Sequence, residues 1–210
     1  MRINTYSGLI EAVPKYIGRD DSEIKERMDD FIILVESEVN QRLRVRDNLC
    51  WSDGNISTET RFMPLPCNYL EMKQIFLIVQ GEQSKIDHVH PDAINVKSYV
   101  DTPSCYTIGS CIELDCVGCE AYKISMNYYA EISPLSATND SNWLTIKHPS
   151  VYLEGLKWAA NSFIENTDMA DRSLSKMIAL IEHLNGVDIA GSIGTAPQVK
   201  IQGGEIDSVW

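Results

Sequence analysis

The spacing of apolar residues changes twice along this 210-residue chain, from helical to strand-like and back to helical. In the first part, apolar side chains recur every three or four positions, as on the buried face of amphipathic helices. Residues 51–132 instead hold short runs rich in Ile, Val, Tyr and Thr, separated by Gly, which is typical of β-strands joined by hairpins. In one run, alternate side chains are expected to share a face: Tyr122, Ile124, Met126 and Tyr128.

Capping and proline signals predict where the helices begin and end. A first helix is expected to be short or to be kinked at Pro14, and to end at Gly18. Behind an acidic pair with capping-box spacing, Asp20 and Glu23, one apolar stripe continues for about five to six helical turns. It predicts a long second helix. After the strand region, Pro149 suits the first position of a third helix, and a fourth apolar stripe follows it.

The predicted fold class is α+β. Two apolar helical stripes before the strands and two after them can bury their faces only against each other, so we predict a four-helix bundle with an inserted small antiparallel β-barrel or sandwich. The Asn-Gly pair at 185–186 is expected to end the fourth helix, and the Gly-rich remainder to form an extended C-terminal arm. The predicted parts are 1–49 (first half of the bundle), 50–132 (β insertion), 133–186 (loop and second half of the bundle) and 187–210 (arm).

The acidic composition argues against a protein that binds nucleic acid along its backbone. The net charge is −12, whereas such a protein presents a basic surface to the phosphate groups. No run approaches the roughly 20 apolar residues that span a bilayer, and the first residues do not form an export signal. The six cysteines are accordingly expected to be reduced thiols, in the cytosol or in a particle assembled there.

Candidate catalytic and metal-binding groups are scattered rather than assembled. Four cysteines lie close together within the strand region, at Cys105, Cys111, Cys116 and Cys119. They include one C-x2-C pair of the kind that zinc sites use, but small apolar fillers of strands are the favoured interpretation. His88 and His90 lie on one side of a predicted strand and lack an obvious third ligand. Because there is also no nucleophile elbow and no Gly-rich phosphate loop, we predict no enzymatic activity, no cofactor and no metal site.

Three arginines follow the second predicted helix, at Arg42, Arg44 and Arg46. Cations near the C-terminus of a helix interact favourably with its dipole, so the cluster can be a solvated helix end. The other interpretation is a contact with an acidic partner subunit. The sequence supports either interpretation.

Five segments, taken in order, resemble the head-to-tail adaptor (connector) proteins of tailed bacteriophages. They are YSGLIEAVPKYIGRDD, FIILVESEVNQRLRVRDNL, RFMPLPCNYLEMKQIFL, TPSCYTIGSCIEL and ISMNYYAEISPLSATNDSNWLTIKHPSVYLEGLKWAA. The resemblance covers about residues 6–184, and the last segment is its most specific part. Two positions depart from the family pattern, since Asn68 and Ser150 stand where Asp is common.

The resemblance implies a structural virion protein at the head–tail junction, assembled in the cytoplasm of the bacterial host. Such adaptors form a ring beneath the portal protein, and twelve copies are expected from the portal's symmetry. The ring extends the DNA channel and offers a docking surface to tail and nozzle proteins, while DNA passes without specific binding. An acidic lumen would repel DNA, in agreement with the net charge. No membrane contact is expected. The alternatives are another neck or tail-completion protein and a small zinc-binding regulatory module.

The resemblance also suggests which residues meet partners and which hold the fold. The arm is expected to dock on the portal or on a neighbouring subunit, and the cationic cluster to contribute. The residues expected to dock are Val199, Ile201, Ile206, Val209, Trp210, Arg42, Arg44 and Arg46. The residues interpreted as a structural junction between the β insertion and the third helix are Trp143, Pro149 and Tyr152. His148, in the same stretch, is expected to have no catalytic role.

Overall fold

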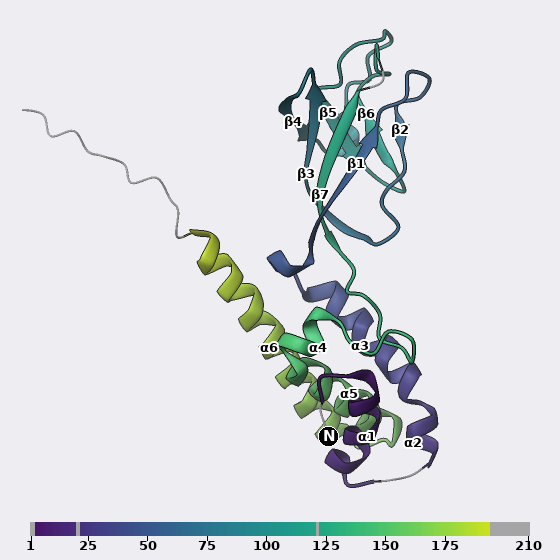
Figure 1. Cartoon of the computed structure of the whole chain (residues 1–210), viewed down its shortest axis with the longest axis vertical. Coiled ribbons are helices and arrows are strands. Elements are labelled where there is room, and N and C mark those ends of the chain that lie inside the picture. Colours follow the sequence, from purple (N-terminus) through teal and green to yellow (C-terminus); the bar gives the residue numbers. More distant parts are fainter. Residues whose placement is uncertain (1–2, 20–21, 121, 194–210) are drawn as a thin grey trace, which may run out of the picture.

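The computed structural model describes residues 3–19, 22–120 and 122–193, which form a group of helices and a curled β-sheet that follow one another along the long axis (Figure 1). Six α-helices lie within these residues. They are α1 (Tyr6–Ile17), α2 (Ser22–Glu26), α3 (Met28–Arg42), α4 (Trp143–Lys147), α5 (Pro149–Phe163) and α6 (Thr167–Ile193). In sequence, the strands lie between α3 and α4, so the sheet separates two groups of three helices.

The first helices follow their capping signals, except at Arg27. The Thr5 hydroxyl accepts a hydrogen bond from the Gly8 N–H (3.1 Å) at the start of α1, and Gly18 ends this helix in the left-handed conformation (φ 73°). The predicted end of the first helix is thereby confirmed. The predicted long second helix is divided, because Arg27 leaves helical geometry (φ −94°, ψ 0°) between α2 and α3. Asp20, the predicted capping residue, lies outside the described residues.

The predicted four-helix bundle is wrong, although the chain is α+β. Helices α1, α3, α4 and α6 each pack on α5, which lies at the centre of the helical part. Two of the six helices, α2 and α4, have only five residues, whereas α6 has 27. The apolar stripes are therefore buried around one central helix instead of in two matched pairs. The core contains Leu9, Val35, Val39, Leu156 and Met177.

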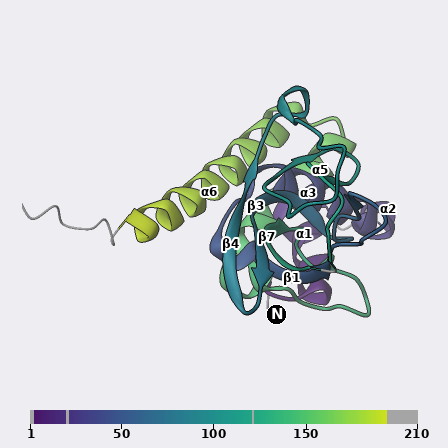
Figure 2. The same ribbon diagram turned by 90° about the horizontal axis from the view of Figure 1, so that it is seen from above.

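Helix α6 is longer than predicted and extends beyond the other helices (Figures 1 and 2). It continues through the Asn-Gly pair at 185–186, where the sequence predicted its end, to Ile193. The glycine C-cap expected there has positive φ, which Gly186 does not adopt. Asn185 instead directs its side chain to the end of α3. The predicted start of the arm at residue 187 is therefore wrong, because the helix occupies that position.

The second part is one curled sheet of seven strands among the described residues, not a barrel or a sandwich. The strands are β1 (Leu49–Asn55), β2 (Phe62–Met63), β3 (Tyr69–Val79), β4 (Glu82–His88), β5 (Cys105–Ile108), β6 (Ile112–Leu114) and β7 (Lys123–Ala130). Their order is β1-β7-β3-β4-β5-β6-β2, so the sheet stays open at β1 and β2. All pairings are antiparallel except that of β4 with β5. The long connection between these two strands, which contains η2 (Pro91–Ala93), permits the parallel pairing.

The sheet has an apolar core of its own on its inner face. The alternation predicted for β7 is confirmed, because the residues expected to share a face are all buried: Tyr122, Ile124, Met126 and Tyr128. At the β3–β4 hairpin, Gln80 and Gly81 both adopt positive φ (52° and 89°), as a two-residue hairpin turn requires. Two segments connect the sheet to the helices, namely 43–48, which contains η1 (Arg46–Asn48), and 131–142. We call the region where these segments meet α3, α4, α5 and α6 the junction.

Candidate partner interface at the helix–sheet junction

The end of α3 is held by a side chain from α6. The last carbonyl groups of a helix have no partner within the helix. The side-chain amide of Asn185 donates to the Arg42 carbonyl oxygen (2.9 Å), and its side-chain oxygen accepts from the Arg44 N–H (2.9 Å). Asn185 therefore joins the last turns of α6 to the start of the sheet connection. This role could not be predicted from the sequence, because no local pattern marks a contact between residues so far apart.

Arg44 connects the end of α3 to the sheet. Its Nε donates to the carboxylate of Glu71 on β3 (2.7 Å), and one terminal nitrogen donates to the Asn40 carbonyl oxygen (2.7 Å). The guanidinium also lies over the ring of Tyr129 on β7, 6.0 Å from the centroid. These contacts make Arg44 a structural link between the helical part and the sheet.

Arg42 and Arg46 are also ion-paired within the chain, but their side chains remain accessible. Arg42 pairs with Glu38 one turn earlier on α3 (3.1 Å), and Arg46 pairs with Asp188 on α6 (2.8 Å). Exposed ion pairs of this kind are weak, because solvent screens them and two long side chains lose freedom. Each arginine of the predicted cluster thus has an acidic partner in its own chain, and Arg42 and Arg46 can still reach a neighbouring molecule.

Trp143 and Pro149 lie where the chain returns from the sheet to the helices. Asn142 begins α4 with a reciprocal capping box, in which its side chain accepts from the Thr145 N–H (2.9 Å) and the Thr145 hydroxyl accepts from the Asn142 N–H (3.0 Å). The Trp143 indole N–H donates to the side-chain oxygen of Asn48 on η1 (2.9 Å). Pro149 occupies the first turn of α5. This arrangement ties the start of α4 to the segment that enters the sheet.

A buried polar network surrounds Tyr152. Its hydroxyl donates to Glu36 Oε1 on α3 (2.9 Å) and accepts from the side-chain amide of Asn142 (2.7 Å). The same Glu36 oxygen accepts from the Leu135 N–H (2.8 Å). Burial raises the pKa of the Glu36 carboxyl, against the lowering effect of these hydrogen bonds, and burial beside Glu36 raises the pKa of Tyr152. Sequence reasoning missed Glu36, because nothing in the helical pattern distinguishes it from the exposed acidic residues of α3.

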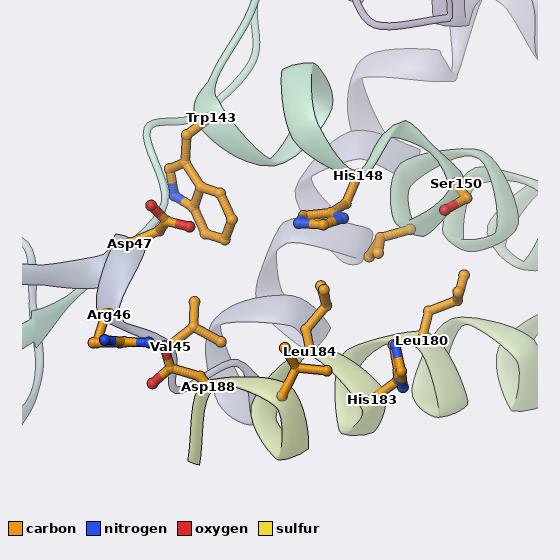
Figure 3. A pocket seen from close by; sticks show the side chains of 12 residues that line it. Val45, Arg46, Asp47, Trp143, His148, Ser150, Leu180, His183, Leu184 and Asp188 are labelled. Atoms are coloured by element: carbon orange, nitrogen blue, oxygen red, sulfur yellow. Dashed lines mark hydrogen bonds and ion pairs between the residues drawn. The ribbon is translucent and has the colours of Figure 1, made fainter. Parts of the chain in front are cut away.

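A groove of about 350 Å³ opens in the junction, between α6 on one side and η1 with the starts of α4 and α5 on the other (Figure 3). Apolar side chains form much of its lining. They are Val45, Trp143, Val151, Leu180, Leu184 and Val187. Polar side chains lie around it from both sides, among them Arg46, His148 and His183 (Figure 3). The His148 ring meets Trp143 edge-on, with centroids 6.4 Å apart, so it forms part of the groove wall.

The cysteine and histidine candidates do not assemble into a metal site within the described part of the chain. No group of three or more His, Cys, Asp or Glu side chains there is placed to hold a metal ion. The buried Cys116 thiol donates to a backbone carbonyl (3.3 Å), and the Cys119 thiol contacts the Tyr122 hydroxyl (2.7 Å). His88 stacks on the ring of Tyr106. These groups have local packing and hydrogen-bonding roles in the sheet.

The docking residues predicted in the arm lie outside the described residues. They are Val199, Ile201, Ile206, Val209 and Trp210. The structure does describe the preceding turns of α6, which line the groove and reach past it. Val187, the first residue of the predicted arm, is therefore a helical residue at the groove, and its side chain is 57% exposed.

One family model, described as SU10 adaptor protein, matches residues 4–195. The match includes both groups of helices, the whole sheet and the junction. The chain belongs to the SU10 adaptor protein family. This family consists of structural phage adaptors and not of enzymes, which agrees with the resemblance drawn from the five sequence segments. No curated protein matches the chain.

Membership of the SU10 adaptor family gives the function at a coarse level. The protein is a structural adaptor and a component of the phage particle, and adaptors bind portal and tail proteins. None of the helices in the described ranges is long and apolar enough to cross a membrane.

Proposed function

We propose that this protein forms the ring-shaped adaptor between the portal and the tail of a phage, in twelve copies that match the portal's symmetry. The observation that supports this proposal most is the family match over residues 4–195, which includes the helical part and the sheet. In this proposal the ring extends the DNA channel and provides the surface on which tail and nozzle proteins assemble. The protein acts at the head–tail junction of the virion and is assembled in the cytoplasm of the bacterial host.

The shape of the subunit suits a connector. The helices and the sheet lie towards opposite ends of the long axis, and each part has its own apolar core (Figure 1). Such a subunit can offer one end to the portal and the other to the tail. The contacts of Arg44 and Asn185 at the junction hold the two parts together, so that a load on one end is transmitted to the other.

The charge of the protein suits a channel through which DNA moves. A basic lumen would bind phosphate groups and release their counterions, which would slow ejection. With a net charge of −12, a ring of these subunits would instead repel the DNA backbone. In this proposal DNA passes through the ring without specific binding.

We assign the contacts with the portal or a neighbouring subunit to two places. The first is segment 194–210, which holds the apolar docking residues predicted from the sequence. The second is the accessible part of Arg42 and Arg46, whose ion pairs are exposed. Arg44 is assigned to the fold, because its contacts with Glu71 and Tyr129 lie within the chain.

Deleting residues 194–210 is expected to weaken portal binding by about tenfold or more. Burial of Trp210 at a partner would contribute about 2–3 kcal/mol, and each 1.4 kcal/mol corresponds to a factor of ten in affinity. The deletion begins after Ile193 because α6 extends to that residue. Titration of purified portal with the full and the shortened chain measures the effect, and urea unfolding of both chains checks that the rest stays folded. Equal affinities would contradict the proposed docking role.

A further inference from the structure

The groove at the junction exposes apolar side chains to solvent within the described part of the chain. Val45 and Val151 are buried in its floor, and Trp143 and Leu184 are half-buried in its walls. Val187, which also lines the groove, is 57% exposed. Concave apolar surfaces of this kind are preferred binding places for large side chains, because burial there removes apolar area from water on both partners.

We propose that segment 194–210 of the same chain folds back and places Val209 and Trp210 in this groove. Helix α6 carries the segment and also forms one wall of the groove. The described part of the helix reaches Ile193, about 9 Å beyond Val187 at the helical rise per residue. An extended chain spans about 3.3 Å per residue, so residues 194–208 can return to the groove with length to spare.

The size of the groove fits one or two large side chains rather than a helix. Its volume of about 350 Å³ lies near the lower end of the range for ligand pockets, about 300–1,000 Å³. Trp210 is the largest apolar side chain of the segment, and Val209 precedes it. The Trp143 ring in the groove wall offers an aromatic partner, and aromatic pairs are favourable beyond the area that they bury.

Attachment to the same chain favours this occupant over a second copy of the protein. A segment tethered to the same chain has an effective concentration of up to the millimolar range at a site that it can reach. Purified proteins are ordinarily studied at much lower concentrations. The segment of the same chain therefore fills the groove before a second chain can.

The docked segment would hide the residues that we assign to portal binding. In the free protein, Trp210 would be held in the groove of its own chain, and the portal would have to compete for it. The segment would thus limit self-association of the adaptor before it meets the portal. This role as a mask rests on the proposed function, whereas docking of the segment in the groove does not.

Fluorine NMR of the full chain labelled with 5-fluorotryptophan tests the docking without any portal. The chain has four tryptophans, and Trp210→Phe identifies the Trp210 resonance. We expect this resonance to differ from that of a peptide with the sequence of residues 194–210. Val187→Asp places a charge at the groove and is expected to lower the docked population about tenfold or more. The Trp210 resonance should then move towards the value of the peptide.

Ile33→Asp on α3 is the matched control, because Ile33 is 65% exposed and does not line the groove. It should leave the Trp210 resonance unchanged, and so should about a hundredfold dilution, because docking within one chain does not depend on concentration. A wild-type Trp210 resonance at the value of the peptide would overturn the proposal. A resonance that moves there only on dilution, with a fall in the light-scattering mass, would overturn it in favour of a second copy. Neither result depends on portal binding, so the proposed function can fail separately.

Discussion

Replacing Glu36 with alanine is expected to lower the free energy of unfolding by about 2–5 kcal/mol. One carboxylate oxygen accepts from the Tyr152 hydroxyl (2.9 Å) and from the Leu135 N–H (2.8 Å), and Glu36 is only 7% exposed. Alanine removes the acceptor and leaves both donors buried without it, at a cost of about 1–3 kcal/mol for each. Urea unfolding followed by circular dichroism measures the difference. A loss below about 0.5 kcal/mol, the usual range for surface substitutions, would contradict the network.

Glu36→Gln is the matched variant, because it keeps a side-chain oxygen for both donors and removes the charge. Burial raises the folded-state pKa of Glu36, so the carboxyl holds its proton more tightly in the folded chain than in the unfolded chain. The wild-type protein should therefore lose stability relative to Glu36→Gln as the pH rises from about 4.5 through the raised pKa, and the difference should no longer change with pH below that window. Unfolding curves at several pH values test this. A constant difference across the window would show that folding does not change the pKa of Glu36, which would contradict the raised pKa.

Replacing Gly155 with alanine is expected to lower the free energy of unfolding by about 1–3 kcal/mol. Gly155 lies in α5 and packs against both α3 and α6: a Cβ there would lie 2.6 Å from Val35 Cγ1 and 2.8 Å from Met177 Sδ. The methionine side chain can move aside, whereas the branched Val35 side chain has little rotational freedom in a helix. The added methyl group should therefore push α3 away from the central helix. Thermal and urea unfolding measure the effect.

Gly186→Ala on α6 is the control for this substitution. A Cβ at Gly186 would have no heavy atom within 4 Å, and the residue is helical. Alanine has the higher helix propensity by about 1 kcal/mol, so this variant should be as stable as the wild-type protein or slightly more stable. If alanine lowers the free energy of unfolding at Gly155 but not at Gly186, the close packing of the helices around Gly155 is the cause. A loss of stability at Gly186 equal to that at Gly155 would contradict this explanation.

Features that depend on neighbouring residues could be predicted from the sequence. The end of α1 at Gly18 and the start of α5 at Pro149 each follow from the backbone preference of one residue. The inward face of β7 follows from the alternation of side chains along a strand. The division of the second helix at Arg27 was missed, because the apolar stripe continues across it.

The arrangement of the helices and of the sheet could not be predicted in this way. Apolar stripes show that each helix has a buried face, but they do not show which helix lies at the centre, and the assumption of matched pairs led to a four-helix bundle. The parallel pairing of β4 with β5 likewise depends on the path of a long connection, and the sheet is open because β1 and β2, at its two ends, do not pair with each other. Asn185 looked like the end of its own helix, because its actual partners at Arg42 and Arg44 are remote in the sequence.

The candidate site could likewise be predicted from the sequence only in part. The sequence directed attention to Trp143, Pro149 and Tyr152, which the structure places together at the junction. Their partner Glu36 was not identified, and neither was the groove, because both are formed by elements that come together only in the folded chain. The acidic partners of the three arginines were missed for the same reason.

Multi-angle light scattering of the purified chain, alone and mixed with the portal of the same phage, tests the central claim most directly. The proposed function predicts that the chain alone has the mass of one subunit, 23.6 kDa, and that it joins the portal as one adaptor chain for each portal chain. A stable oligomer that does not bind the portal would contradict the proposed function. It would assign the protein to another position in the neck or tail.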